Sequence, residues 1–235
     1  MKPILNKLSN YLPELLAFGL LASGRWQWFL GWCALSGTLG VLSYAFIGPA
    51  IFQKNAAGAL PLLSRVIHAP WIWEYRLVVA ADRWYGLPAV NEVSPGLWLG
   101  RRLLPREVPE GIGLVVDLTA EAPRIEGLPE GVDYVCLPTL DGTAPEAEGL
   151  VALVDRIVRC STPVLIHCAK GQGRSATVMA AVLVDRGLAS DIQDAVVLMR
   201  RSRPRVRLHL GQRRCLRAYF QHGDVLLADS LSLEA

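Results

Sequence analysis

The sequence has no Cys-x-x-Cys motif, and its cysteines are few and irregularly spaced. They are Cys33, Cys136, Cys160, Cys168 and Cys215. An odd number at irregular spacing argues against a disulfide framework and a zinc site, and it indicates a reducing compartment. Internal repeats and low-complexity segments are also missing. The 235 residues therefore predict one catalytic domain of ordinary size plus an extra segment.

Charge is missing from the 24 residues between Phe29 and Phe52. About 20 apolar residues cross a bilayer as a helix. Aromatic residues stand near both ends of the run, as they do at membrane interfaces, and Lys54 follows it. We predict a transmembrane helix over 29–52, within a membrane anchor that covers 1–54. The alternative is a buried core helix.

A second apolar stretch precedes this run and is ambiguous because it contains Pro13 and Glu14. If it is helical over 4–24, it would form a second membrane helix. The sequence therefore allows either one or two membrane passes. A hairpin would bring the basic residues to one side of the membrane, which the positive-inside rule makes cytoplasmic. Those residues are Lys2, Lys7, Lys54, Arg65 and Arg76. A cleaved signal peptide is not expected, because the apolar region comes late and no small-x-small site follows it.

Residues 55–90 form a connector rich in tryptophan, with Trp71, Trp73 and Trp84. Basic and aromatic residues alternate along it. It is either an interfacial segment that lies on the membrane or a helix that packs against the catalytic domain. The pattern leaves both interpretations open.

From residue 91 the pattern becomes that of a soluble α/β domain, which we expect to cover 91–223. Short apolar runs predict strands, and between them lie segments with helical spacing. The strands are expected at 96–100, 113–119, 132–138 and 164–166, and the helices at 145–159, 174–186, 191–201 and 211–222, with Ser190 as an N-cap. This alternation predicts a central, mostly parallel sheet flanked by helices. Residues 224–235 are expected to be a tail.

The apolar run before His167 stops abruptly, and a turn with Gly171 and Gly173 leads into a helical pattern that begins at Arg174. The free N–H groups at a helix N-terminus bind anions, and glycines let successive N–H groups converge. The Arg174 guanidinium matches the geometry of phosphate oxygens. Positive potential around Cys168 favours its thiolate, which is a nucleophile.

The segment His167-Cys168-Ala-Lys-Gly171-Gln-Gly-Arg174-Ser175 resembles the signature of the cysteine-dependent protein tyrosine and dual-specificity phosphatases, and every fixed position matches. The resemblance extends over about 91–222. It implies a compact phosphatase domain and a phosphocysteine intermediate on Cys168, without a metal or other cofactor. The phosphate group would be bound by the loop residues Ala169, Lys170, Gly171, Gln172, Gly173 and Arg174.

Two residues that flank the loop have less certain roles. Ser175 could hydrogen-bond the sulfur and assist its departure, or it could bond only to the helix backbone. His167 helps to shape the loop and tune the thiol in the family, but the sequence alone fits a core histidine equally well.

Hydrolysis of a phosphate monoester also needs a general acid for the leaving oxygen. Asp117 lies within an apolar strand and Asp133 at the entry of another, so both are interpreted as structural. Asp141 follows a strand and precedes Gly142, as the acid loop does in compact members of the family. We predict Asp141 as the acid, with Glu146 in reserve. Gln172 and Gln212 are candidates for positioning the hydrolytic water.

A dense basic run bears on the class of substrate. It contains Arg200, Arg201, Arg203, Arg205, Arg207, Arg213, Arg214 and Arg217. Such a surface beside a membrane attracts anionic lipid. Nucleic acid is not expected, because no groove-reading motif accompanies the arginines. With Lys170 in the loop, the combination resembles the lipid-directed branch of the family, such as the phosphatidylglycerophosphate phosphatases.

These observations predict a membrane-bound phosphatase whose catalytic domain faces the cytoplasm and acts on a phospholipid or inositol-type headgroup. A phosphatase for phosphotyrosine, phosphoserine or phosphothreonine in membrane proteins is the first alternative. An inactive phosphate-binding adaptor is the second, although the full set of Cys168, Arg174 and Asp141 argues against it.

Overall fold

The computed structural model describes residues 12–233. Four α-helices come first: α2 (Leu12–Ala22), α3 (Trp26–Leu42), α4 (Leu62–Ile67) and α5 (Ala69–Trp84). A π-helical turn, Ser43–Ile47, and a 3-10 turn, Gly48–Phe52, extend α3. Together they make a helical run, Trp26–Phe52, of 27 residues, which by length and composition alone is able to cross a membrane. Of the second predicted span, the structure describes only α2, and residues 1–11, with Lys2 and Lys7, lie outside the described part.

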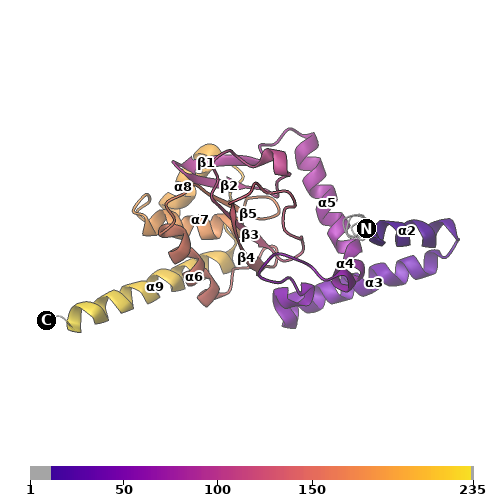
Figure 1. The fold of residues 1–235 in the computed structure, drawn as a ribbon. Coiled ribbons are helices and arrows are strands. Elements are labelled where there is room, and N and C mark those ends of the chain that lie inside the picture. Colours follow the sequence, from indigo (N-terminus) through magenta and orange to yellow (C-terminus); the bar gives the residue numbers. More distant parts are fainter. Residues whose placement is uncertain (1–11, 234–235) are drawn as a thin grey trace.

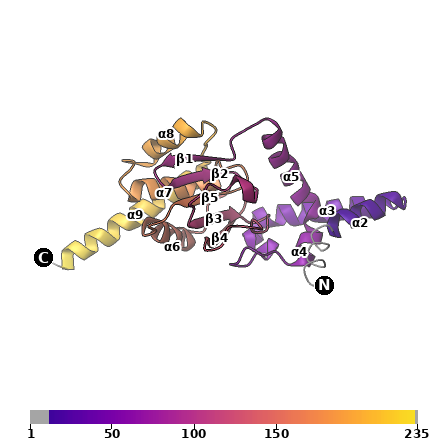
Figure 2. The ribbon, with the colours of Figure 1, turned by 45° about the horizontal axis from the view of Figure 1, so that its top comes forward.

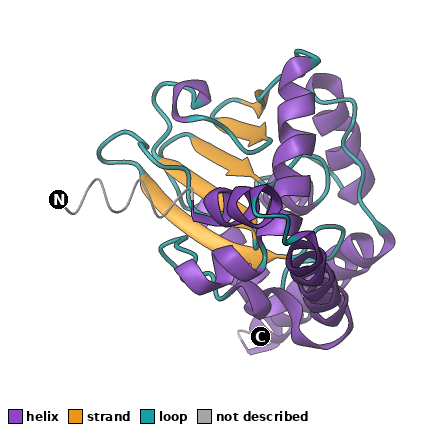
Figure 3. Cartoon of the chain, turned by 90° about the vertical axis from the view of Figure 1, so that its right-hand side faces the viewer, coloured by secondary structure: helices purple, strands orange, loops and turns teal. Residues whose placement is uncertain are grey.

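The α/β domain follows, with strands β1 (Val90–Ser94), β2 (Leu97–Gly100), β3 (Leu114–Thr119), β4 (Asp133–Thr139) and β5 (Val164–His167). Its sheet has the order β1-β2-β5-β3-β4, and only the β1–β2 pair is antiparallel. Figure 3 shows the strands side by side with helices next to them. The predicted, mostly parallel sheet is confirmed. β1 is an additional strand that was not predicted, because Val90–Ser94 lacks a long apolar run.

The remaining elements are a 3-10 turn at Pro105–Glu107 and helices α6 (Ala147–Val158), α7 (Arg174–Asp185), α8 (Ile192–Ser202) and α9 (Leu210–Leu233). Two expectations for these helices were wrong. The N-cap of α8 is Asp191, whose carboxylate accepts a hydrogen bond from the Asp194 N–H, and not Ser190. The expected tail is helical as far as Leu233, because α9 continues past Gly223 and projects away from the domain (Figure 1).

The central strand β5 divides the core of the domain between the two faces of the sheet. Val164 and Ile166 point toward helices α6–α9, whereas Leu165 packs with loop residues such as Leu103 and Ile125 on the other face. This alternation is that of a strand with both faces covered. The carboxyl end of β5 therefore delivers His167 and Cys168 to a rigid edge of the sheet.

The N-terminal helices form a unit that packs against the edge of the α/β domain near β3 and β4. The Trp32 indole donates to the Val66 carbonyl oxygen at 2.9 Å, which ties α3 to α4. Gly40 allows close approach to α5, since a Cβ atom there would lie 2.1 Å from the Trp71 ring. Figures 1 and 2 show this unit on the side of the domain opposite the end of α9.

The segment after this helical run docks on the α/β domain. Phe52 is buried against Ala120 and Leu140. Lys54 is fully buried and donates to the Asp117 carboxylate at 2.8 Å and to the Thr119 carbonyl oxygen at 2.6 Å. The sequence marked Lys54 only as the charge that follows the apolar run, and the structure shows that its side chain neutralises a buried aspartate.

Candidate active site

The loop between β5 and α7 curls around the sulfur of Cys168. Gly171 has a φ of +66°, and a Cβ atom there would lie 2.4 Å from the Gly100 carbonyl oxygen, so that only glycine fits. Its N–H donates to Cys168 Sγ at 3.2 Å, and the Ser175 hydroxyl lies at the same distance from Sγ. Two hydrogen-bond donors therefore point at the buried sulfur. The predicted strand, loop and helix geometry is therefore present.

Arg174 is fully buried and is held from below by a carboxylate that the sequence analysis did not identify. Both Glu121 oxygens accept hydrogen bonds from its two terminal nitrogens at 2.8 Å, and the Thr139 carbonyl oxygen accepts another at 2.8 Å. Burial alone would lower the pKa of Arg174, but the charge of Glu121 raises it well above its usual value. The Nε–H group of Arg174 is buried and has no partner among the described residues, so it is available to an anion.

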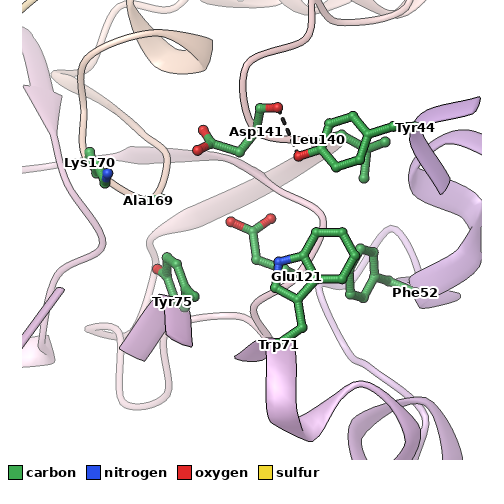
Figure 4. A pocket seen from close by; sticks show the side chains of 9 residues that line it. All are labelled: Tyr44, Phe52, Trp71, Tyr75, Glu121, Leu140, Asp141, Ala169 and Lys170. Atoms are coloured by element: carbon green, nitrogen blue, oxygen red, sulfur yellow. Dashed lines mark hydrogen bonds between the residues drawn. The ribbon is translucent and has the colours of Figure 1, made fainter. Parts of the chain in front are cut away.

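Asp141 lies at the mouth of this loop, as predicted from its position after β4. Its Oδ1 is 3.2 Å from Arg174 Nη2, and its side chain is exposed. The Tyr44 hydroxyl, from the π-helical turn after α3, donates to the Asp141 carbonyl oxygen at 3.0 Å (Figure 4). The structure thus brings Asp141 and Arg174 together, and it adds a residue of the N-terminal unit to the loop that carries Asp141.

His167 and Asp117 lie beneath the loop in the core. His167 is fully buried, and burial lowers its pKa to about 4 even though the Asp117 carboxylate opposes this shift. Asp117 accepts hydrogen bonds from Lys54, the Tyr134 hydroxyl and Thr119. Burial alone would raise the pKa of Asp117, but the positive charge of Lys54 lowers it overall. His167 is therefore neutral at neutral pH.

The other acidic candidates lie in structural positions. Glu146 is the N-cap of α6, where its carboxylate accepts from the N–H groups of Glu148 and Gly149. Asp133 pairs with Arg156 at the domain surface. Among the acidic residues considered as general acids, Asp141 is the one with a direct contact to Arg174.

The basic run was expected to be a surface that attracts anionic lipid, but not all of its arginines are at the surface. Arg203 is buried and donates to the loop carbonyl oxygens of Gly171 at 2.7 Å and Lys170 at 2.8 Å, and to Asn91 at 2.9 Å. The N–H of Arg207 donates to the Gln172 carbonyl oxygen at 2.9 Å. These contacts engage the carbonyl oxygens of Lys170, Gly171 and Gln172 from behind the loop, while the Gly171 N–H points at the sulfur of Cys168.

The structure does not single out one of the two candidates for positioning the hydrolytic water, Gln172 and Gln212. Gln212 is buried against Gly173, and its amide donates to the Thr143 carbonyl oxygen at 2.9 Å, which joins α9 to the loop of Asp141. Gln172 is partly exposed in the loop. Both side chains are therefore close to the loop residues, and Gln212 already has a structural partner.

A cavity of about 320 Å³ opens in front of these groups. One side consists of Ala169, Lys170, Glu121, Leu140 and Asp141 from the α/β domain. The other side consists of aromatic residues from the N-terminal unit, namely Tyr44, Phe52, Trp71 and Tyr75 (Figure 4). Tyr44 stacks on Trp71, and Phe52 meets Trp71 edge to face. No local sequence pattern predicted that this unit lines the cavity.

Comparison with known proteins agrees with the geometry. Residues 106–188 match a family model described as a DSP-PTPase phosphatase of polymorphic toxin systems. The fold is similar to that of PTPMT1, with 19% identity and a TM-score of 0.51, where the match covers 60% of this chain and 99% of that chain. Tk-PTP in its active form is 30% identical, with a TM-score of 0.47 over 57% of this chain and 97% of the other. Human DUSP28 is 24% identical, with a TM-score of 0.48 over 58% and 96%.

A search of curated proteins gave no significant match. The family model covers the sequence from Arg106 to Leu188, which includes Glu121, Asp141, Cys168 and Arg174. From this match and the loop geometry, we conclude that the α/β domain is a cysteine-dependent phosphatase of the dual-specificity and protein tyrosine phosphatase type, a phosphoric monoester hydrolase.

Proposed function

We propose that the protein is a membrane-anchored phosphatase that hydrolyses a phosphate monoester on a phospholipid or inositol-type headgroup. The observation that carries this proposal is the wall of the catalytic cavity. Tyr44, Phe52 and Trp71 line it, and they come from helices that precede the phosphatase domain. A substrate in the loop would therefore also touch the unit that we expect to lie in or on the membrane.

The surface of the N-terminal unit supports a membrane location. Among the side chains that the structure describes, all but four of the exposed large hydrophobic ones lie before Gly86, and Phe18, Trp28 and Phe46 are among them. Core helices and signal sequences can have the same length and composition as Trp26–Phe52. However, only 22% of the most apolar part of this run is buried inside the structure, which favours an apolar environment outside the protein.

The first chemical step uses Cys168, Arg174 and Asp141. The thiolate of Cys168 attacks phosphorus, and a P–S bond forms as the P–O bond to the leaving group breaks. The loop N–H groups and the Arg174 guanidinium stabilise the charge of the transferring phosphoryl group. Phosphate arriving at Arg174 competes with Asp141 for Nη2, and Asp141 in its protonated form donates its proton to the leaving oxygen.

The second step releases inorganic phosphate. Water attacks the phosphocysteine, Asp141 accepts a proton from it, and the P–S bond breaks to return the Cys168 thiolate. The hydroxyl of Ser175, which lies 3.2 Å from Sγ, stabilises the departing sulfur. His167 acts from the core as a neutral residue that completes the end of β5.

Turnover of the full chain in vesicles tests this function against a protein substrate. We expect hydrolysis of a vesicle-borne phospholipid phosphomonoester to be favoured by kcat/KM over hydrolysis of a phosphotyrosine peptide. A strong preference for the peptide would assign the enzyme to membrane phosphoproteins instead. If Cys168→Ser and the wild type were equally inactive on both substrates, the adaptor hypothesis would apply.

A further inference from the structure

A second cavity, which we call the arginine cavity, lies between α5 and the segments 102–105 and 123–126. Its volume is about 600 Å³. Five arginines line it, with Glu126 as the acidic lining residue: Arg65, Arg76, Arg83, Arg102 and Arg124. A concentration of positive charge in a hollow attracts anions, because the low-dielectric walls strengthen the field inside.

Three buried donors among the lining residues have no acceptor in the part of the chain that the structure describes. They are the Tyr75 hydroxyl, Arg83 Nε and Arg102 Nη1. A buried donor without an acceptor costs free energy, so native structures rarely leave several in one place. Phosphate offers several acceptor oxygens and a negative charge, which suit hydroxyl and guanidinium donors of this kind.

The protein's own acidic residues compensate part of this charge, and the Glu126 carboxylate opposes the lowering of the Arg65 pKa by burial. Arg76 pairs with Glu14. Arg83 Nη2 lies 3.8 Å from Oε2 of Glu107, a carboxylate that already pairs with Arg101. Burial lowers the pKa of Arg83, and the nearby charges of Arg101 and Arg102 also lower it while Glu107 opposes them. The Arg124 guanidinium stacks on the Tyr134 ring at 4.6 Å, which leaves its charge uncompensated by that contact.

The arginine cavity adjoins the catalytic cavity. Tyr75 lines both of them. The N–H of Arg102 donates to the carbonyl oxygen of Ala169, in the catalytic loop, at 3.0 Å. Arg65, Arg76 and Arg83 belong to α4 and α5, which precede the residues matched by the phosphatase family model.

We propose that the arginine cavity is a second phosphate-binding site, which takes the phosphodiester group of an anionic phospholipid headgroup while the phosphomonoester occupies the catalytic loop. The phosphodiester belongs either to the substrate itself or to a neighbouring lipid. Binding of the anion does not depend on the proposed function, whereas its use in substrate selection rests on it.

Binding is measured by calorimetry on the full chain in an uncharged detergent, with glycerophosphoglycerol as a soluble phosphodiester probe. We expect binding to persist in Arg174→Lys and to weaken about 10-fold or more in Arg102→Gln and in Arg124→Gln, which remove charge-assisted hydrogen bonds from different walls. The control Arg156→Gln, at an exposed ion pair on α6, should bind as the wild type does. Absence of binding in the wild type, or its loss only in Arg174→Lys, would overturn the proposal.

Turnover then distinguishes the two sources of the phosphodiester. If it belongs to the substrate, kcat/KM for glycerophosphoglycerol phosphate should exceed that for glycerol phosphate about 10-fold, and Arg124→Gln should abolish this preference. If it belongs to a neighbouring lipid, kcat/KM should be equal for the two substrates, and the variants should change only the binding of the probe. A protein that binds the probe through the arginine cavity but hydrolyses no lipid would keep this site and reject the proposed function.

Discussion

The hydroxyl of Tyr44 lies 3.0 Å from the carbonyl oxygen of Asp141, and this contact joins the apolar N-terminal helices to the loop of the proposed general acid. Tyr44 belongs to a π-helical turn, a rare conformation that is frequent at functional sites. Any movement of the N-terminal unit would therefore reach the loop directly. The position of this unit relative to the phosphatase domain is then part of the catalytic geometry.

Tyr44→Phe removes this hydrogen bond but keeps the ring that stacks on Trp71. A net hydrogen bond stabilises by about 1 kcal/mol, so we expect kcat on alkyl phosphates to fall about 3- to 10-fold. Tyr85→Phe, at an exposed position after α5, is the matched control and should have wild-type kcat. Equal kcat for Tyr44→Phe and wild type in steady-state assays would show that the loop does not depend on this contact.

Asp141→Asn tests the assignment of the general acid. Alkyl leaving groups need a proton and aryl groups need it less, so kcat should fall about 100-fold or more on an alkyl phosphate and much less on an aryl phosphate. The comparison uses initial rates on both substrates at one pH. An equal loss on both would assign the acid to another residue.

Glu121→Gln tests whether the carboxylate beneath Arg174 positions the guanidinium. The substitution leaves a buried charge without its partner, which costs about 3 kcal/mol of the free energy of unfolding, and kcat/KM should fall about 10-fold or more as Arg174 loses its fixed orientation. Denaturant titration and steady-state kinetics measure the two effects. The control Glu146→Gln keeps an acceptor at the N-cap of α6 and should retain wild-type kcat, which also tests the reserve acid.

Arg203→Lys tests the support of the catalytic loop from behind. A lysine cannot reproduce donors to Gly171, Lys170 and Asn91 at once, and we expect kcat/KM to fall about 10-fold with little change in overall fold by circular dichroism. Arg205→Lys, at an exposed position two residues later, is the control. Similar kinetics for both variants would mean that the carbonyl contacts of Arg203 do not order the loop.

The buried histidine predicts how stability depends on pH. The pKa of His167 is lowered from 6.5 to about 4, so between these values the unfolded chain binds a proton that the folded chain does not. The free energy of unfolding should therefore decrease as the pH falls through this window, by up to about 3 kcal/mol from His167. His68, whose pKa burial also lowers, adds to the slope. Urea titrations across the window give the slope of the unfolding free energy against pH. The slopes of wild type and His167→Gln should differ by the equivalent of about one bound proton, and identical slopes would contradict the assignment.

The sequence predicted the features that are local in the chain. The β5 strand, the glycine loop and the start of α7 lie within the short stretch from Val164 to Arg174, and their pattern predicted the loop around Cys168 directly. Asp141, whose role as the acid stays a prediction, was placed beside this loop because it follows a strand that the apolar pattern also marked. The mostly parallel sheet followed from the alternation of strands and helices.

The residues that the sequence did not predict act over long separations. Glu121 is 53 residues from Arg174, and Tyr44 is 97 residues from Asp141. No local pattern distinguishes Glu121 from other acids, or Arg203 from the exposed arginines beside it. The burial of Lys54 was not predicted, because a lysine after an apolar run usually marks a membrane surface, whereas here the docking of Phe52 carries its side chain into the core.

The most direct test of the account is to quench the full chain during turnover of a radiolabelled phospholipid phosphomonoester in vesicles and to map the label by mass spectrometry. The account predicts labelled phosphate on the sulfur of Cys168, and no label and no phosphate release with Cys168→Ser. Phosphate release without label on Cys168, or release that persists in Cys168→Ser, would contradict it.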